Sequence, residues 1–376
     1  MHMGRKFGIM GAICRKGGEK MARWMFGAGD ETARAQMLEL GFTAVTDNRA
    51  DLKPDNLSGM ALWRCLPAFS RRYVQNPDEH LALDPTGVPH KWFGSVCPTL
   101  PEAQEGNLAH ARRAAAEEGI SGILIDGCRF SSPASGAGLD SFFTCFCPRC
   151  KAKMRELGLD AERITASVSA LQRLCRGEGA QVDAEGIRQW LDFRRAVVSE
   201  HIRAFVRAIK EVNPALPVGI YAFSPAMAIW VGQDYAALKD AGIDLFAPMI
   251  YRHWKDEDGP ACLNVEVAAI ARGLERSLSP EQVRQVLEQA CGIPMPGETA
   301  QEIFDRGFGP ETVKLEVERV RAAVGDAPLW PILQLADEKL AESERAALEG
   351  GADGVAFFAW NEQGADWLKR LAPMEE

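Results

Sequence analysis

The stretch Gly122-Ile-Leu-Ile-Asp126-Gly-Cys-Arg129-Phe130 is the clearest indication of the fold, because it has the pattern of a buried strand that ends in a carboxylate and an arginine. In a (β/α)8 barrel, apolar parallel strands deliver polar side chains from their C-terminal ends into one shared mouth. The stretch therefore predicts a barrel strand that presents Asp126 and Arg129 to such a mouth.

Similar apolar runs recur along the chain and alternate with helical patterns, as expected of strands that are covered on both faces. We expect strands at Phe7–Ile13, Thr43–Thr46, Ala61–Leu66, Gly122–Asp126, Pro217–Ala222, Leu245–Tyr251, Leu329–Leu335 and Val355–Trp360. Eight strand–helix units predict an α/β protein with a closed (β/α)8 TIM barrel. A doubly wound open sheet is the alternative, but the segment from Gly11 to Lys16 lacks the Gly-rich first turn of that fold.

The chain has 376 residues, a length that a barrel with insertions reaches as one domain. We expect a single domain over residues 1–376, with long loops after the third and fourth strands, at 67–95 and 131–183. The second of these, 131–183, is expected to be an inserted cysteine-containing loop or helical segment. Long loops on a compact barrel usually carry function or build the wall of a site.

Composition excludes several classes of partner. The net charge of −9 disfavours a nucleic-acid binder, which needs a basic face. No apolar stretch reaches the roughly 18 residues that a membrane span needs. The N-terminal segment is a poor signal peptide, so we expect a cytoplasmic protein. The sequence allows a homo-oligomer but does not specify one.

Polar and aromatic residues gather at the predicted strand ends, a mixture that suits a polyhydroxylated ligand because ring faces stack while polar edges form hydrogen bonds. We expect a carbohydrate substrate, cleaved by carboxylate chemistry, with Asp126 as nucleophile or acid and Glu362 ranked first as the second carboxyl group. The predicted substrate-binding residues are Arg129, Asp47, Tyr221, Tyr251, His253, Gln334, Trp360 and Asn361. Arg129 is also expected to keep Asp126 ionised.

Three cysteines crowd into six residues at Cys145-Phe-Cys147-Pro-Arg-Cys150, a spacing typical of metal ligands. A closed tetrahedral site needs a fourth ligand, and Cys97 and Cys128 are both candidates. Four thiolates leave no open position for substrate, so we expect a structural zinc and no organic cofactor. Reduced metal-free cysteines, a local disulfide or an iron–sulfur cluster are the alternatives.

The segment from Cys145 to Met154 resembles the cysteine segment of family 42 glycoside hydrolases, the β-galactosidases. That resemblance implies a zinc held by the triplet and an upstream cysteine, whose position Cys97 matches better than Cys128. Three further stretches resemble family-10-like and α-amylase-superfamily-like glycoside hydrolase barrels, and that resemblance implies that the acid at the end of the fourth strand is catalytic. They are 122–130, 244–251 and 351–360.

The chain departs from the family 42 pattern at the fourth strand, where Asp126-Gly-Cys-Arg129 stands in place of the Asn-Glu pair that carries the general acid. That role is therefore not transferred to this chain. Two other hypotheses stay open: a barrel that binds a glycan without cutting it, and metal-dependent chemistry at the cysteine cluster.

Overall fold

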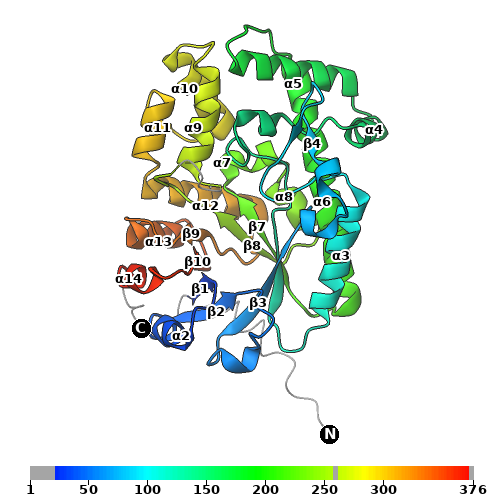
Figure 1. Cartoon of the computed structure of the whole chain (residues 1–376). Coiled ribbons are helices and arrows are strands. Elements are labelled where there is room, and N and C mark those ends of the chain that lie inside the picture. Colours follow the sequence, from blue (N-terminus) through cyan, green and yellow to red (C-terminus); the bar gives the residue numbers. More distant parts are fainter. Residues whose placement is uncertain (1–21, 257–260, 372–376) are drawn as a thin grey trace.

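The computed structural model describes residues 22–256 and 261–371, which form a closed barrel of eight parallel strands (Figure 1). Around the barrel the strands follow the order β1-β10-β9-β8-β7-β6-β3-β2. The strands are β1 Ala22–Phe26, β2 Phe42–Thr46, β3 Ala61–Pro67, β6 Gly122–Asp126, β7 Val218–Phe223, β8 Leu245–Met249, β9 Ile332–Gln334 and β10 Gly354–Phe358. The predicted (β/α)8 barrel is confirmed.

The first barrel strand is not the predicted one. Phe7–Ile13 lies outside the described residues, and the barrel begins at β1, which pairs with β2 on one side and β10 on the other. These two pairings close the barrel, so it has no position for a ninth strand. The sequence of β1, Ala-Arg-Trp-Met-Phe, escaped prediction because Arg23 interrupts its apolar run. That arginine is buried in an ion pair with Glu344 of helix α13, 2.6 Å apart.

Helices surround the barrel, and most begin or end at residues that the sequence marks (Figure 1). The helices are α2 Glu31–Glu39, α3 Pro101–Ala115, α4 Pro148–Glu156, α5 Ala161–Cys175, α6 Ala184–Val212, α7 Pro225–Ala228, α8 Tyr235–Asp240, α9 Leu263–Leu274, α10 Pro280–Cys291, α11 Ala300–Arg306, α12 Pro310–Val324, α13 Leu340–Glu349 and α14 Gly364–Leu368. At α10, Ser279 caps the first turn and Pro280 is the first helical residue. No helix in residues 22–256 and 261–371 is both long and apolar enough to cross a bilayer.

Side chains inside the barrel lie in layers, because alternate residues of each strand point inward. Near the start of the strands, Trp24 packs against Trp63 and Trp330, with ring centroids 4.8 and 4.6 Å away. Since β2 separates β1 from β3, the Trp24–Trp63 contact crosses the barrel interior. Gly122 lies beside Trp63, so the face of β6 that carries Gly122, Leu124 and Asp126 points inward.

The two long loops have structure of their own and pack together. The loop after β3 contains η2 Arg71–Tyr73, η3 Pro77–His80 and an antiparallel hairpin, β4 Ala82–Leu83 with β5 Pro89–His90. The loop after β6 contains η4 Leu139–Phe143, α4 and α5. The Phe146 N–H donates to the carbonyl of Leu83 over 2.8 Å, which joins the two loops. Two further short 3-10 turns are η1 Pro54–Asn56 and η5 Ile229–Val231.

Candidate functional site

The mouth of the barrel holds a layer of aromatic and polar side chains around Asp126. The hydroxyl groups of Thr46 in β2 and Tyr221 in β7 are 2.9 Å apart. These strands are not neighbours, so this hydrogen bond spans the interior. The ring of Tyr221 lies 5.9 Å from that of Phe26, and Phe358 links Phe26 to Tyr251 with centroids 5.2 and 5.6 Å apart. Three strands and the residues that follow β8 therefore contribute one continuous aromatic surface, made by Phe26, Tyr221, Tyr251 and Phe358.

Asp126 ends β6 at the edge of this surface and is half-buried. Burial raises the pKa of its carboxyl group, while a 2.7 Å hydrogen bond from the Gly127 N–H and the charge of Arg129 partly oppose that effect. The Asp126 charge in turn contributes to the raised pKa values of Tyr221 and Tyr251, after the larger effect of burial. The carboxyl group thus interacts electrostatically with both phenols and keeps its proton to a higher pH than an ordinary aspartate.

Arg129 does not form an ion pair with Asp126. Its guanidinium is buried among three aromatic rings, with its carbon 5.2 Å from the Trp92 centroid, 5.0 Å from Phe93 and 4.7 Å from Phe223. Burial lowers the pKa of Arg129 to about 10, and the charges of Glu266 and Asp126 oppose this. The positive charge of Arg129 therefore acts on Asp126 without an ion pair between them. The guanidinium itself lies in the wall of the site, where it stacks on aromatic rings.

Glu266 of α9 is a buried carboxylate that the sequence did not single out. It accepts hydrogen bonds from the Ser132 hydroxyl (2.6 Å) and the Ala134 N–H (2.7 Å), on the loop that follows Arg129. The Ser132 hydroxyl oxygen also lies 2.9 Å from that of Ser135, which in turn lies 3.3 Å from the Arg129 guanidinium. Burial raises the pKa of Glu266, and Ser132 and Arg129 oppose that rise. A polar network therefore runs from α9 through the serines to Arg129.

One other predicted binding residue, Gln334, also lies at the mouth. Gln334 ends β9 and is buried, with its amide oxygen 4.0 Å from the Cys262 thiol. Thr46 and Cys65 belong to the same layer although the sequence did not flag them. These two residues could have been predicted from the sequence, because both lie near the end of a predicted strand at a position that points inward.

His253 and Asp47 have structural contacts of their own. His253 packs its ring against Gly307, and burial lowers its pKa. Asp47 accepts hydrogen bonds from Ala28 N (3.0 Å) and Arg49 (2.9 Å). Burial raises the pKa of Asp47, but the hydrogen bonds from Arg49 and Ala28 outweigh burial and lower it overall. Asp47 thus joins the loops after β1 and β2.

The three predicted site residues that follow β10 differ in how exposed they are. Trp360 is half-buried and packs on Gly27, Gly29 and Gly364. Asn361 is exposed and accepts a 2.8 Å hydrogen bond from the Gln363 N–H, a local turn contact. Glu362 is exposed in the turn before α14. The structure therefore does not bring Glu362 into the buried layer that holds Asp126.

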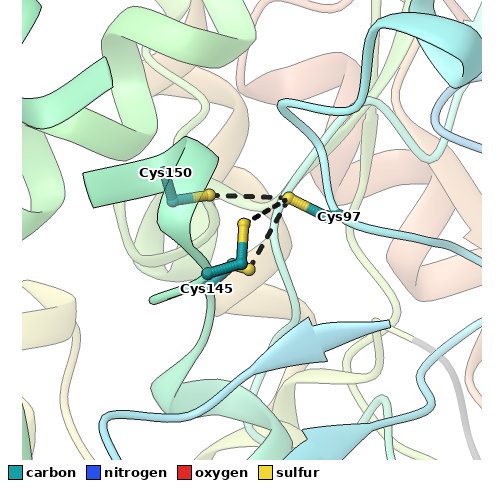
Figure 2. A group of neighbouring side chains, drawn as sticks. Cys97, Cys145 and Cys150 are labelled. Atoms are coloured by element: carbon teal, nitrogen blue, oxygen red, sulfur yellow. Dashed lines mark hydrogen bonds between the residues drawn. The ribbon is translucent and has the colours of Figure 1, made fainter. Parts of the chain in front are cut away.

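The four cysteines Cys97, Cys145, Cys147 and Cys150 form one buried cluster (Figure 2). Their sulfur atoms all lie within 4.8 Å of one another. Cys97, before α3, is 3.5 Å from Cys147 and from Cys150 and 3.6 Å from Cys145. Cys128 is not in the group, so Cys97 is the fourth member. Every cysteine in residues 22–256 and 261–371 is free of disulfides.

The cluster fits a tetrahedral metal ion. Four sulfurs bound to zinc at about 2.3 Å lie about 3.8 Å apart, close to the separations found here. Burial raises the pKa of Cys145 and Cys150, whereas hydrogen bonds from Cys145, Cys150 and Cys97 lower that of Cys147. The Leu83 N–H points at the Cys145 sulfur from 3.4 Å, a contact that favours a thiolate. The group could therefore hold a metal ion.

No protein family model and no curated protein matches the sequence. The fold, by contrast, is similar to solved glycoside hydrolases. The glycoside hydrolase domain of PgaB (BpsB) from Bordetella bronchiseptica has a TM-score of 0.53 and 14% sequence identity, over 92% of this chain and 95% of that one. The β-galactosidase from Bacillus circulans sp. alkalophilus has a TM-score of 0.53 and 12% identity, over 90% of this chain. The β-galactosidase from the haloarchaeon Halorubrum lacusprofundi has a TM-score of 0.52 and 14% identity, over 91% of this chain.

The chain has a glycoside-hydrolase-like TIM barrel fold. It spans about half the length of the two β-galactosidases, 50% and 52%. At these identities the likeness is one of fold, so the chemistry of this barrel has to be argued from its own residues.

Proposed function

We propose that the protein is a glycosidase that cleaves a glycosidic bond at the barrel mouth, with Asp126 as a catalytic carboxyl group. The observation that carries the proposal is the inward position of Asp126, which is half-buried at the end of β6 and interacts electrostatically with the Tyr221 and Tyr251 phenols. A sugar could stack on the aromatic surface and form hydrogen bonds with the two phenols and Gln334.

The raised pKa of Asp126 favours the role of general acid over that of nucleophile. A carboxyl group that retains its proton at higher pH can donate it to the leaving oxygen of a glycosidic bond. Glycoside cleavage needs a second carboxyl group in most families, and Glu362 remains our candidate. Because Glu362 is exposed in the turn before α14, this assignment requires the side chain to approach the bound sugar.

The test is hydrolysis of a panel of nitrophenyl glycosides and oligosaccharides by wild-type protein, Asp126→Asn and Glu362→Gln. We expect Asp126→Asn to lower kcat by at least about 100-fold, the usual contribution of a positioned acid or base. Asp366→Asn on the exposed face of α14 is the matched control and should retain full activity. Full turnover by Asp126→Asn would rule out a catalytic role, and glycan binding without hydrolysis would identify a binding barrel.

We further propose that the cysteine cluster holds a structural zinc ion. Cys97 lies before α3, whereas Cys145, Cys147 and Cys150 lie at the start of α4, so one ion would join the two long loops. All four members are buried and would fill a tetrahedral shell, which supports a structural role.

A further inference from the structure

A cavity of about 330 Å³ lies on the outside of the barrel, where helix α3 packs against strand β3 (Figure 1). Its walls come from β3, the C-terminal end of α3, the loop after β2 and the turn η2. This volume is at the lower end of the range of small-molecule sites. None of the described residues that line it belongs to the aromatic layer at the barrel mouth, so the cavity is separate from the candidate active site.

The cavity is cationic, although the whole chain carries a net charge of −9. Four cationic side chains line it, and Glu117 is the one carboxylate among the described lining residues, which leaves an excess of three positive charges. The four are Lys53, Arg64, Arg72 and Arg113. Like charges in one recess repel one another, so an anion that enters it relieves that repulsion.

Two of the four cations share Glu117 as their partner. The Glu117 carboxylate accepts hydrogen bonds from Arg64 over 2.5 and 3.0 Å, and the Lys53 ammonium lies 3.5 Å away. Arg72 and Arg113 are both exposed, and neither side chain forms an ion pair or hydrogen bond with any residue in 22–256 and 261–371. Their two charges are therefore available to a ligand.

Arg72 and Arg113 act on the same two neighbours. Burial lowers the pKa of His110, and the charges of Arg113 and Arg72 lower it further. Burial raises the pKa of the Tyr73 phenol, while a hydrogen bond with Asn107 and the same two arginine charges oppose that rise. The Tyr73 hydroxyl lies 2.9 Å from Nδ1 of His110, which lines the cavity. Because both arginines act on one hydrogen-bonded pair, a single anion could contact both of them.

The walls that carry these arginines are held in place. Arg64 is buried and donates hydrogen bonds of 2.8, 3.0 and 3.1 Å to three backbone carbonyls of the loop after β2, which fixes that loop against β3. On the other side, η2 packs closely on α3, since a Cβ atom added at Gly106 would lie 2.5 Å from Tyr73. The cavity is therefore preformed, which lowers the entropic cost of binding.

We propose that this cavity binds a phosphate group, either as the free ion or as part of a sugar phosphate, independently of the proposed glycosidase function. A phosphate group carries about −1.5 to −2 charges at pH 7, which matches the two arginines that lack a carboxylate partner. Guanidinium groups bind its oxygens through parallel, charge-assisted hydrogen bonds. A single carboxylate would neutralise only one of the two arginines.

The test is isothermal titration calorimetry with sodium phosphate and with D-glucose 6-phosphate, at constant ionic strength because salt screens exposed charges. We expect Arg72→Gln/Arg113→Gln to weaken the binding of both probes at least about 10-fold, and each single variant to show part of this loss. The matched control, Arg71→Gln/Arg112→Gln, removes the same charge from the adjacent positions, which lie outside the cavity and have carboxylate partners. This control should bind both probes as wild type does.

The outcomes separate this site from general attraction to a basic surface. Binding that is lost in Arg72→Gln/Arg113→Gln and kept in the control would place the phosphate in the cavity. Tighter binding of glucose 6-phosphate would then identify a sugar phosphate as the ligand, and equal or weaker binding would identify the free ion. No binding by wild type, equal weakening in the control, or binding that survives in the folded Arg72→Gln/Arg113→Gln variant would overturn the site.

Discussion

Asp126 and Asp47 both follow barrel strands, but their surroundings shift their pKa values in opposite directions. Burial raises the pKa of Asp126, so its carboxylate costs stability once the pH exceeds the unfolded value near 4. We expect Asp126→Asn to stabilise the protein at pH 7 by about 1 kcal/mol, as removal of a strained site group often does. The gain should shrink as the pH falls towards 4, where the wild-type group is protonated in both states. Denaturant titrations across that range measure it.

Asp47→Asn is the matched comparison, because we expect it to change stability in the opposite direction to Asp126→Asn. The pKa of Asp47 is lowered overall, because hydrogen bonds from Arg49 and Ala28 outweigh burial, so its ionised form stabilises the fold above the unfolded pKa. We expect a loss of up to about 1 kcal/mol at pH 7, limited by solvent screening at the exposed Arg49. The loss should disappear as the pH falls through the folded pKa. Equal pH dependence in both variants would contradict this assignment of the two environments.

Arg129 and Glu266 compensate for each other as buried charges, linked through Ser132 and Ser135. Removing one charge leaves the other without its partner, so we expect Arg129→Gln to cost about 3 kcal/mol. Glu266→Gln should also destabilise. The double variant Arg129→Gln/Glu266→Gln should lose at least about 1 kcal/mol less unfolding free energy than the two single variants lose together, as expected of coupled residues. Strict additivity in equilibrium unfolding would show that the network does not couple them.

At the scale of elements, the cysteine cluster joins the segment before α3 to the start of α4. We expect one zinc per chain by elemental analysis, and loss of the metal in Cys147→Ser. Because a structural ion contributes to folding, that variant or a chelator should lower stability by about 3 kcal/mol or more. Cys128→Ser, a buried cysteine outside the cluster, should keep its zinc. Metal-free wild-type protein of unchanged stability would contradict the structural role.

Some helices and strands could be predicted from the sequence and others could not. The prediction of Ala184–Val212 matches α6, because Asp183 caps its start and Asn213-Pro214 ends it. The segment 131–183 was expected to be a loop or helical insertion, but the separate bounds of α4 and α5 were not predicted, although Pro148 and Asp160 mark their starts. There the short connections and the cysteine triplet obscured the periodicity. Strand β1 escaped because its buried Arg23 needs Glu344, a partner 321 residues away.

At the scale of the whole molecule, closure of the barrel decides which side chains meet. The sequence could predict that Asp126, Tyr221, Tyr251 and Gln334 follow inward strand ends, because parallel strands share one mouth. It could not predict that Arg129 stacks on Trp92 and Phe93, which belong to the loop after β3. Nor could it predict that α5 packs against α9, since these two helices meet only in the fold. Contacts between distant loops therefore account for most of what was missed.

The opposite end of the barrel provides a test of that closure. Gly122 begins β6, and an added Cβ atom would lie 2.2 Å from the Trp63 ring, which packs on Trp24 across the interior. Close-packed interiors resist added volume, so we expect Gly122→Ala to destabilise the protein by about 2 kcal/mol. Trp63→Phe removes the clashing part of the ring and breaks no hydrogen bond, since the buried Trp63 indole N–H has no partner in the described structure.

The double variant Gly122→Ala/Trp63→Phe should therefore be more stable than the sum of the single changes predicts, by about 1 kcal/mol. Equilibrium unfolding of the four proteins measures this coupling. Because Asp126 lies two alternations along the same inward face, the double variant should also retain glycoside hydrolysis better than Gly122→Ala. Additive losses would mean that β6 shifts to relieve the clash, and Asp126 would then move with it.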